Sequence, residues 1–305
     1  MSFNGFLVID KPAGYSSHQV VAKVRKILNE RRVGHTGTLD PMATGVLVVA
    51  VGFCTKLIPF LDEQKKVYQA KLVIGLTTDT QDLSGRVVSA QPETAVTQEM
   101  MRAALSNFTG ELEQTPPMYS AVKVQGEPLY KLARAGKEIP RKKRKITIFR
   151  LEVVDNLRPV YGFQEGPYLR IECSRGTYIR TLCHELGAYL GCGGCMGDLV
   201  RLASGPFRLG KAVSLDELQK AMEQAEVASL LLSPAEALAH LPLVTLDQQS
   251  AKLVRHGGRV YLQSKDALQE SELARGMTTD GRLLAILKYV GGEKPYWQPV
   301  RVLDQ

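Results

Sequence analysis

The spacing of apolar residues in the first quarter of the chain predicts strands with a helix between them. Residues 5–10 (GFLVID) and 46–52 (VLVVAVG) are short apolar runs typical of buried strands. Between them, residues 16–30 repeat apolar side chains at helical spacing behind serines that can cap a helix. In residues 68–76 (YQAKLVIGL), side chains alternate as in a half-buried strand. The pattern therefore predicts a β-rich start.

The middle of the chain mixes helices and strands, and the end changes character. Residues 97–109 and 214–228 repeat apolar side chains at helical spacing, whereas 168–174 alternate as a strand. From residue 243 onward the sequence becomes strand-like, with glycines between the runs. The expected C-terminal strands are RVYL (259–262), LLAILKYV (283–290) and VRVL (300–303). We therefore place a domain boundary at 241–243.

One further helix is predicted at residues 175–191. It would begin at Thr177 as its cap and stop at Gly191. Tyr178 and Arg180 would then fall in its first turn. The helix dipole does not favour a cation there, so Arg180 indicates a carboxylate or phosphate partner elsewhere in the fold.

Together these elements predict a large part that mixes helices and strands, followed by a small C-terminal β domain. The 305 residues, 44% of them hydrophobic, can fill a core of that size. No apolar stretch approaches the roughly 18–20 residues of a membrane span. The five cysteines, with no signal pattern near the N-terminus, predict a reduced, cytoplasmic protein.

Charge adds a candidate partner to this picture. Lys and Arg number 39 against 31 Asp and Glu, which gives a net charge of +8 and a pI near 9.2. A polyanionic partner would explain the excess, and so would an ordinary basic surface. Residues 114–145 are rich in prolines and glycines and end in a basic run. The run consists of Arg141, Lys142, Lys143, Arg144 and Lys145. Such a run is either a solvated face or the tip of a protruding segment.

Several common catalytic signatures are absent from the sequence. His184 and Glu185 lack the second histidine of a zinc helix, because Ala188 stands at that position. Cys192 and Cys195 form a single CxxC, which supplies too few ligands for a closed zinc site. No phosphate-binding loop or serine-hydrolase motif occurs. We therefore expect no metal site.

One carboxylate differs from the others in its surroundings. Asp40 lies in GHTGTLDPMATG (34–45), among glycines, threonines and a proline, just before an apolar strand. Asp is a common turn residue, and Pro41 favours an extended conformation before it. Alternatively, the glycines let the backbone approach another molecule, and Asp40 is a catalytic group on an anchored loop. Tyr68 likewise is either core packing or a functional residue.

Five motifs follow one another along the chain. They are GHTGTLDP (34–41), KxYxA (66–70), TDTxDxxG (78–85), PPMYSA (116–121) and RGTYIRTL (175–182). In this order they resemble the TruB-type tRNA pseudouridine synthases, from about residue 3 to residue 210. The residues after 243 resemble a PUA-type RNA-binding domain through their strand pattern, Gly257-Gly258 and DGRLLAI.

The resemblance implies that uridine 55 in the T arm of tRNA is converted to pseudouridine. It also implies the pseudouridine synthase fold, an α/β (α+β) fold with a mixed, largely antiparallel sheet flanked by helices and a small C-terminal β domain. The base leaves C1′ through N1 and returns through C5, without redox change or group loss, so no cofactor is implied. The partner would be the tRNA T stem-loop, bound by a stand-alone monomer without guide RNA or membrane. Two alternatives stay open: a non-catalytic RNA-binding protein or tRNA chaperone on the same fold, and a uridine isomerase of a different RNA site.

The resemblance also assigns roles to individual residues. Asp40 would be the essential carboxylate, which either attacks C1′ or acts as a base. Arg180 would pair with Asp40, holding it ionised and aimed, and Tyr68 would stack on the base and take part in proton transfer. The remaining substrate-binding residues would be His35, Tyr178 and Leu199. These contacts would offset the few kcal/mol that base flipping costs.

The resemblance finally divides the chain. A catalytic domain would span 1–241, and a PUA-like RNA-binding domain would span 243–305. Within the first, an insertion at 123–145 would close over the T loop, with the basic run clamping the RNA. Lys11 would be structural, near the floor of the active site. Val200 replaces a second basic residue that many relatives carry, which weakens a phosphate contact there.

Overall fold

The computed structural model describes residues 3–61, 65–124, 126–262 and 272–303. Residues 1–2, 62–64 and 125 of the expected catalytic domain lie outside this range, as do residues 263–271 and 304–305 of the expected C-terminal domain.

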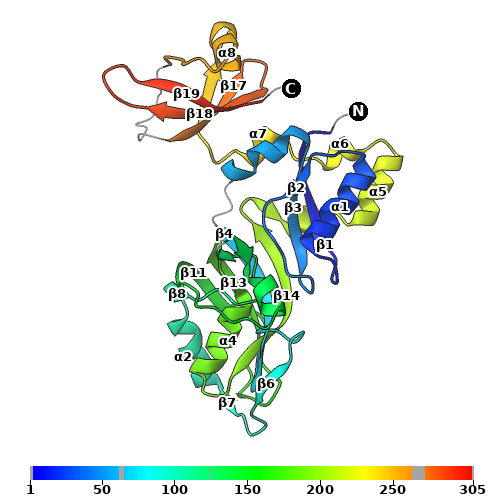
Figure 1. The fold of residues 1–305 in the computed structure, drawn as a ribbon, viewed down its shortest axis with the longest axis vertical. Coiled ribbons are helices and arrows are strands. Elements are labelled where there is room, and N and C mark those ends of the chain that lie inside the picture. The colour runs from blue at the N-terminus through cyan, green and yellow to red at the C-terminus, as the bar shows by residue number, and fades with distance from the viewer. Residues whose placement is uncertain (1–2, 62–64, 125, 263–271, 304–305) are drawn as a thin grey trace.

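A nine-stranded sheet dominates the structure (Figure 1). Its strands are β1 (Gly5–Lys11), β2 (Val33–His35), β3 (Thr44–Val51), β4 (Lys65–Ile74), β8 (Gly110–Gln114), β11 (Arg144–Val153), β13 (Tyr168–Ser174), β14 (Gly194–Ser204) and β15 (Phe207–Arg208). The order is β1-β3-β14-β4-β13-β11-β8, with β2 paired to β3 and β15 to β14. Among the described strand pairs of this sheet, β3 with β14 is the parallel one. The sheet is therefore mixed and largely antiparallel, and the predicted fold class is confirmed.

The β1–β3 part of the sheet is buried on both faces. On one face pack α1 (Ser17–Leu28) and α5 (Leu215–Glu223). On the other face pack the 3₁₀ segment η1 (Gly52–Phe60) and apolar residues of the C-terminal sheet. A strand enclosed on both faces needs apolar side chains at nearly every position. This requirement explains the unbroken run VLVVAV in β3.

The other half of the sheet carries helices on one face. Here α2 (Gln98–Asn107) and α4 (Ile179–Tyr189) share a core with β4, β11, β13 and β14. The opposite face is more exposed, so β4 alternates between buried and partly exposed residues, as its sequence predicted. Among the described residues, no helix is both long and apolar enough to cross a membrane.

The start of α4 differs from the prediction. Thr177 does not cap the helix, because its hydroxyl donates to the Ser174 carbonyl at 2.9 Å. Tyr178 occupies the cap position, ahead of the first turn, and makes no side-chain cap bond. Instead the Gln114 side chain accepts from the Tyr178 N–H (2.8 Å) and donates to the Tyr178 carbonyl (3.1 Å). A distant strand residue therefore supplies the helix start that a local residue was expected to supply.

The predicted helix at 214–228 is also wrong as a single element. It consists of α5 and α6 (Val227–Leu230), and Ala225 between them has a left-handed φ of 59°. A short helix, α7 (Pro234–Ala237), follows and leads to the C-terminal part.

The C-terminal residues form a separate four-stranded sheet, ordered β16-β17-β18-β19. Its strands are β16 (Leu243–Leu246), β17 (Leu273–Thr278), β18 (Leu283–Val290) and β19 (Tyr296–Val302). The predicted strand at 259–262 is wrong, because there only Val260 makes an isolated bridge, to Trp297. The helix α8 (Gln248–Arg255), capped by the Asp247 side chain, was not predicted.

The basic stretch after β8 contains small elements rather than one loop. They are β9 (Lys123–Val124), β10 (Glu127–Pro128) and α3 (Leu129–Arg134). The last two cations of the basic run, Arg144 and Lys145, already belong to β11 and pair with β8. The remaining short elements are β5 (Leu76–Thr78), β6 (Val87–Ala90), β7 (Val96–Thr97), β12 (Val160–Tyr161) and η2 (Leu209–Lys211).

Candidate active site

The loop that carries Asp40 joins β2 to β3 and is fixed to its surroundings at several backbone atoms. The N–H of Leu39 donates to the Ser17 hydroxyl at 2.9 Å, and that hydroxyl lies 3.2 Å from the Leu39 carbonyl. On the other side of Asp40, the Pro41 carbonyl accepts from the Lys11 ammonium at 3.0 Å. The backbone is therefore held immediately before and after the carboxylate.

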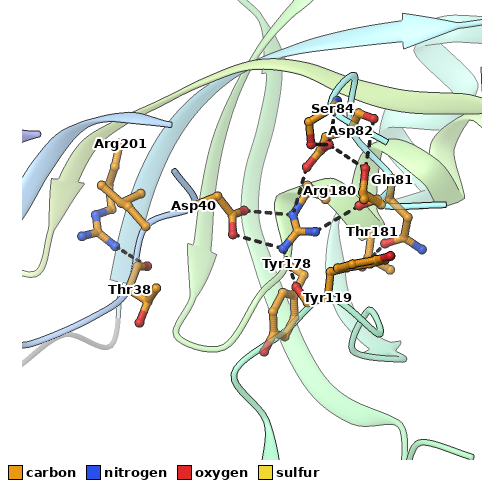
Figure 2. A network of polar contacts seen from close by, with 12 residues as sticks. Thr38, Asp40, Gln81, Asp82, Ser84, Tyr119, Tyr178, Arg180, Thr181 and Arg201 are labelled. Atoms are coloured by element: carbon orange, nitrogen blue, oxygen red, sulfur yellow. Dashed lines mark hydrogen bonds and ion pairs between the residues drawn. The ribbon is translucent and has the colours of Figure 1, made fainter. Parts of the chain in front are cut away.

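Asp40 and Arg180 form a bidentate ion pair (Figure 2). Arg180 Nε lies 2.9 Å from Oδ2 of Asp40, and Nη2 lies 3.1 Å from Oδ1. The Asp40 side chain is 33% exposed, whereas that of Arg180 is 6% exposed. The pair therefore presents a carboxylate to solvent while its guanidinium stays behind it. The acidic partner that the position of Arg180 indicated is thus present in the fold.

Further contacts fix the plane of the Arg180 guanidinium. Nη1 donates to the Thr80 carbonyl at 3.0 Å, and Nη2 donates to the Tyr119 carbonyl at 2.8 Å. Asp82 lies 3.7 Å away from Nε through its Oδ2. Because a guanidinium is a rigid planar fork, partners from several chain segments leave it one orientation. Asp40 is aimed by the same contacts.

Asp82 is a site residue to which the sequence assigned no role. It is buried, and its Oδ1 accepts from the Thr80 hydroxyl (2.7 Å), the Ser84 N–H (3.0 Å) and the Ser84 hydroxyl. These bonds organise the turn between β5 and β6, and they orient the second carboxylate oxygen towards Arg180. The motif TDTxDxxG was the signal that could have found Asp82.

Tyr68 lies on β4 beside this network and is buried at 7% exposure. Burial raises the pKa of its hydroxyl to about 12, while the charge of Arg201 lowers that pKa and the charge of Asp40 raises it. The hydroxyl therefore keeps its proton at neutral pH. Tyr68 and Leu199 belong to one buried cluster, in which Leu199 pairs with Ala70 across the strands.

Lys11 combines burial with complete hydrogen bonding. Burial lowers its pKa to about 8, against the charge of Asp40, which raises it. Its ammonium donates to the carbonyls of Pro12, Tyr15 and Pro41, so all of its N–H bonds are used by the backbone. These contacts support the structural reading of Lys11.

The other expected substrate residues, His35, Tyr178 and Leu199, take no part in the Asp40–Arg180 ion pair. Tyr178 directly precedes α4 and is held by Gln114. His35 lies in β2, where its ring meets that of His18 of α1 edge-on, with centroids 5.0 Å apart. His35 ends β2, from which the Asp40 loop starts, and Tyr178 precedes α4, which carries Arg180. Leu199 lies on β14, which pairs with the strand of Tyr68.

The basic run is less uniform than its sequence suggests. Arg141 turns inward, with 20% of its side chain exposed, and donates to the Pro116 carbonyl at 3.1 Å. Lys143 lies 4.0 Å from Glu113, and both side chains are exposed. Arg144 and Lys145 lie on a strand of the main sheet. Arg141 therefore supports the 116–121 loop, whose Tyr119 carbonyl binds Arg180.

The arrangement offers acid–base or nucleophilic chemistry at a single carboxylate. Asp40 is partly exposed and held through both oxygens, and its charge helps to keep the Tyr68 hydroxyl protonated. Within the part of the chain that the structure describes, no cluster of three or more His, Cys, Asp or Glu could hold a metal.

Two family models match most of the chain. Residues 25–179 match the N-terminal domain of TruB family pseudouridylate synthases. Residues 180–239 match the tRNA pseudouridylate synthase B C-terminal domain. The first model alone covers half of the chain and includes Asp40, Tyr68 and the start of α4.

Named relatives agree over most of their length. A protein of Geobacter sulfurreducens named tRNA pseudouridine synthase B is 51% identical over 83% of this chain and 82% of its own. A protein of the same name from Bacillus cytotoxicus is 40% identical over 98% of this chain and 97% of its own.

Solved structures share the fold. A chain from an H/ACA RNP bound to a substrate RNA containing 2′-deoxyuridine superposes with a TM-score of 0.74 at 25% identity, over 99% of this chain and 85% of that one. A chain from a Cbf5-Nop10-Gar1 complex gives a TM-score of 0.72 at 28% identity, over 98% and 84%.

Proposed function

This chain belongs to the TruB family of pseudouridylate synthases, and on that premise we propose that it converts uridine 55 in the T arm of tRNA to pseudouridine, without a guide RNA. The observation that carries the proposal is the Asp40–Arg180 pair. The two residues are 140 positions apart, and each falls on a motif of the family resemblance. Relatives that share 40–51% of their residues with this chain are named tRNA pseudouridine synthase B.

The reaction is an isomerisation, so its bonds and protons balance within the substrate and water. The bond from N1 to C1′ breaks, the uracil turns, and a bond from C5 to C1′ forms. C5 loses its proton to solvent, and N1 gains one. Asp40 either attacks C1′ or removes a proton from the sugar, and both routes need a carboxylate held at a fixed angle. The two hydrogen bonds from Arg180 provide that angle.

Tyr68 is proposed to serve the proton transfer at the base. Its hydroxyl is protonated at neutral pH, so it first acts as a donor or as a relay. Its ring would stack on the target base, and Tyr178 and Leu199 would line the uracil pocket. His35 would contact the nucleotides displaced around the target. Support comes from their placement on β4, β14, β2 and the start of α4.

Two further regions are proposed to bind RNA. The insertion 123–145 would close over the T loop, which is supported by its exposed cations and by Gly126, whose φ of 89° suits a turn. Residues 243–305 would form the PUA-like domain, following a catalytic domain of residues 1–241. The separate four-stranded sheet supports this division. The five free, buried cysteines support a reducing compartment such as the cytoplasm.

The deciding experiment uses purified protein and a T stem-loop RNA labelled with tritium at C5 of the target uridine. We expect release of one tritium per converted base, with pseudouridine detected at that position. RNA binding without tritium release would instead favour the non-catalytic alternative. Release from a uridine outside the T loop would favour an isomerase of a different RNA site.

A further inference from the structure

Arg201 is a buried cation that the proposed reaction leaves without a role. It lies on β14 and is 1% exposed. Its Nε donates to the Val46 carbonyl at 2.7 Å, and the two terminal nitrogens reach the carbonyls of Gly37 (3.2 Å) and Thr38 (3.4 Å). Among the described residues, its hydrogen-bond partners are uncharged oxygens. Burying a charge on neutral partners is expensive, so core stability alone is a poor reason for an arginine here.

The strand pairings place Arg201 between the two groups on which the reaction depends. It stands opposite Tyr68 in the β14–β4 ladder, so both side chains lie on the same face of the sheet. The positive charge of Arg201 lowers the pKa of the Tyr68 hydroxyl, against the effect of burial. Its carbonyl partners Gly37 and Thr38 lie three and two residues before Asp40.

At Gly45, β3 approaches the backbone of Arg201 too closely to leave room for a side chain. Gly45 pairs with Arg201 where β3 and β14 run parallel. A Cβ on Gly45 would lie 2.4 Å from the Arg201 carbonyl oxygen, and Gly45 has a φ of 94°. Only glycine fits there without strain. The close approach carries the β3 end of the Asp40 loop to the Arg201 side chain.

We propose that Arg201 is a positioning residue, which holds the Asp40 loop in one fixed arrangement opposite Tyr68. The inference rests on the proposed function of the site. Arg180 aims the Asp40 carboxylate from α4, and Arg201 fixes the backbone of the same loop from β14 (Figure 2). A planar guanidinium serves the three carbonyls in one fixed orientation, which neither the rotatable ammonium of a lysine nor the two N–H bonds of a glutamine can do.

The test compares Arg201→Gln and Arg201→Lys with Arg208→Gln. Arg208 is an exposed arginine on β15, and its guanidinium also donates to backbone carbonyls. We expect both Arg201 variants to slow single-turnover tritium release by about 10- to 100-fold, the effect of losing a charged hydrogen bond. The affinity for T stem-loop RNA should stay within about threefold, because Arg201 does not touch the RNA. The control should match the native enzyme in both.

A double-mutant cycle separates positioning from simple core damage. If Arg201 acts partly through the Tyr68 hydroxyl, Arg201→Gln should slow a Tyr68→Phe enzyme at least about threefold less than it slows the native enzyme. Equal slowing in both backgrounds would overturn the link to Tyr68. A native rate of tritium release in Arg201→Lys would contradict the requirement for a planar guanidinium at this position.

Hydrogen exchange gives a readout that does not depend on activity. The amides of Thr36 and Leu39 should exchange at least about fivefold faster in Arg201→Gln, while those of α4 stay unchanged. Unchanged loop exchange would contradict the proposal even if the native protein released no tritium. Faster exchange of amides throughout Arg201→Gln would indicate that this variant unfolds globally. In that case the exchange of the Thr36 and Leu39 amides in Arg201→Lys decides the question. Failure of the proposed function would instead appear in the native protein itself.

Discussion

The arginines around Asp40 are buried and hydrogen-bonded, whereas most cations of the basic run are exposed and have few partners. Arg180 and Arg201 are almost fully buried, and each is bound through both its Nε and its terminal nitrogens. Lys142 to Lys145 are exposed, and Lys143 reaches Glu113 only at 4.0 Å. Catalysis by a carboxylate requires hydrogen-bond donors that already hold it in the reactive orientation. Binding a polyanion requires positive side chains that can move to meet the phosphates. One molecule thus uses cations in two different ways, and substitutions should separate them.

Removing the charge of Asp40 should produce the largest effect. Asp40→Asn keeps the size of the side chain but removes the nucleophile or base, so the rate should fall at least about 1000-fold. Affinity for the RNA should change only a few fold. Tritium release and RNA binding, measured on the same preparation, check this. A rate near that of the native enzyme would refute the assignment of Asp40.

Replacing the planar guanidinium of Arg180 by an ammonium of the same charge should give the next largest effect. Arg180→Lys can satisfy one or two of the four oxygens that Arg180 now contacts, so Asp40 loses its fixed angle. We expect a loss of about 100-fold in single-turnover rate. Arg208→Lys is the matched control. If Arg180→Lys stays within twofold of the native rate, charge alone suffices at this position.

Asp82 tests whether the network extends beyond the first ion pair. Asp82→Asn removes a carboxylate 3.7 Å from Arg180 but retains an oxygen for the turn. We expect a rate loss of about tenfold, smaller than for Arg180→Lys. Asp79→Asn is the control in the same hairpin, because Asp79 pairs with the exposed Arg86 instead. Equal losses in the two variants would indicate that only the turn matters.

The basic run should respond in binding instead. Replacing Lys142, Lys143, Arg144 and Lys145 with alanine should lower RNA affinity about fivefold at moderate salt and leave the rate of bound substrate intact. Each lost phosphate contact should flatten the slope of log affinity against log salt by about 0.9. Arg141→Ala, measured separately, should lower the rate instead, because Arg141 holds the 116–121 loop. An unchanged slope in the fourfold variant would show that these cations face solvent only.

The smallest effect concerns stability at alkaline pH. Burial raises the pKa of Cys54 and Cys173 to about 12 and that of Cys195 to about 11, so the folded state keeps protons that the unfolded state loses from about pH 9. Their stabilisation is present below pH 9 and disappears as the pH rises towards 12. The lowered pKa of Lys11 has the opposite effect, because it makes the folded state more stable as the pH rises from about 8 to 10.5.

Urea unfolding at a series of pH values tests that expectation. Cys173→Ala should flatten the fall of unfolding free energy by about 1 kcal/mol per pH unit between pH 9 and 11. Val49→Ala, at an equally buried position, should lower stability without changing the slope. Parallel slopes in all three proteins would exclude the cysteine as a source.

Local patterns predicted the elements whose ends are decided locally. The helix behind Ser16 and the apolar run of β3 are such cases, since a cap and burial on two faces leave direct traces in sequence. The predicted cap at Thr177 was wrong, because Gln114, far away in the chain, supplies the hydrogen bonds at the start of α4. The helix after Asp247 was missed among strand-like neighbours, although its cap was visible.

The site shows the same limit. Family motifs led to Asp40, Tyr68 and Arg180, and the unfavourable helix position of Arg180 already indicated an acidic partner. Nothing near residue 201 in the sequence shows that three carbonyls converge on its side chain. Such convergence depends on strand pairing, which a single sequence does not display.

The parallel pairing of Gly45 with Arg201 also has a consequence for the timing of synthesis. The Asp40 loop leaves the ribosome long before β14 exists, and it has no Arg201 to hold it until then. At roughly 5–20 residues per second, that interval is on the order of ten seconds or more. A nascent chain can therefore complete its sheet of β1 and β3 early, but it acquires an ordered catalytic centre only after about two thirds of the protein has been translated.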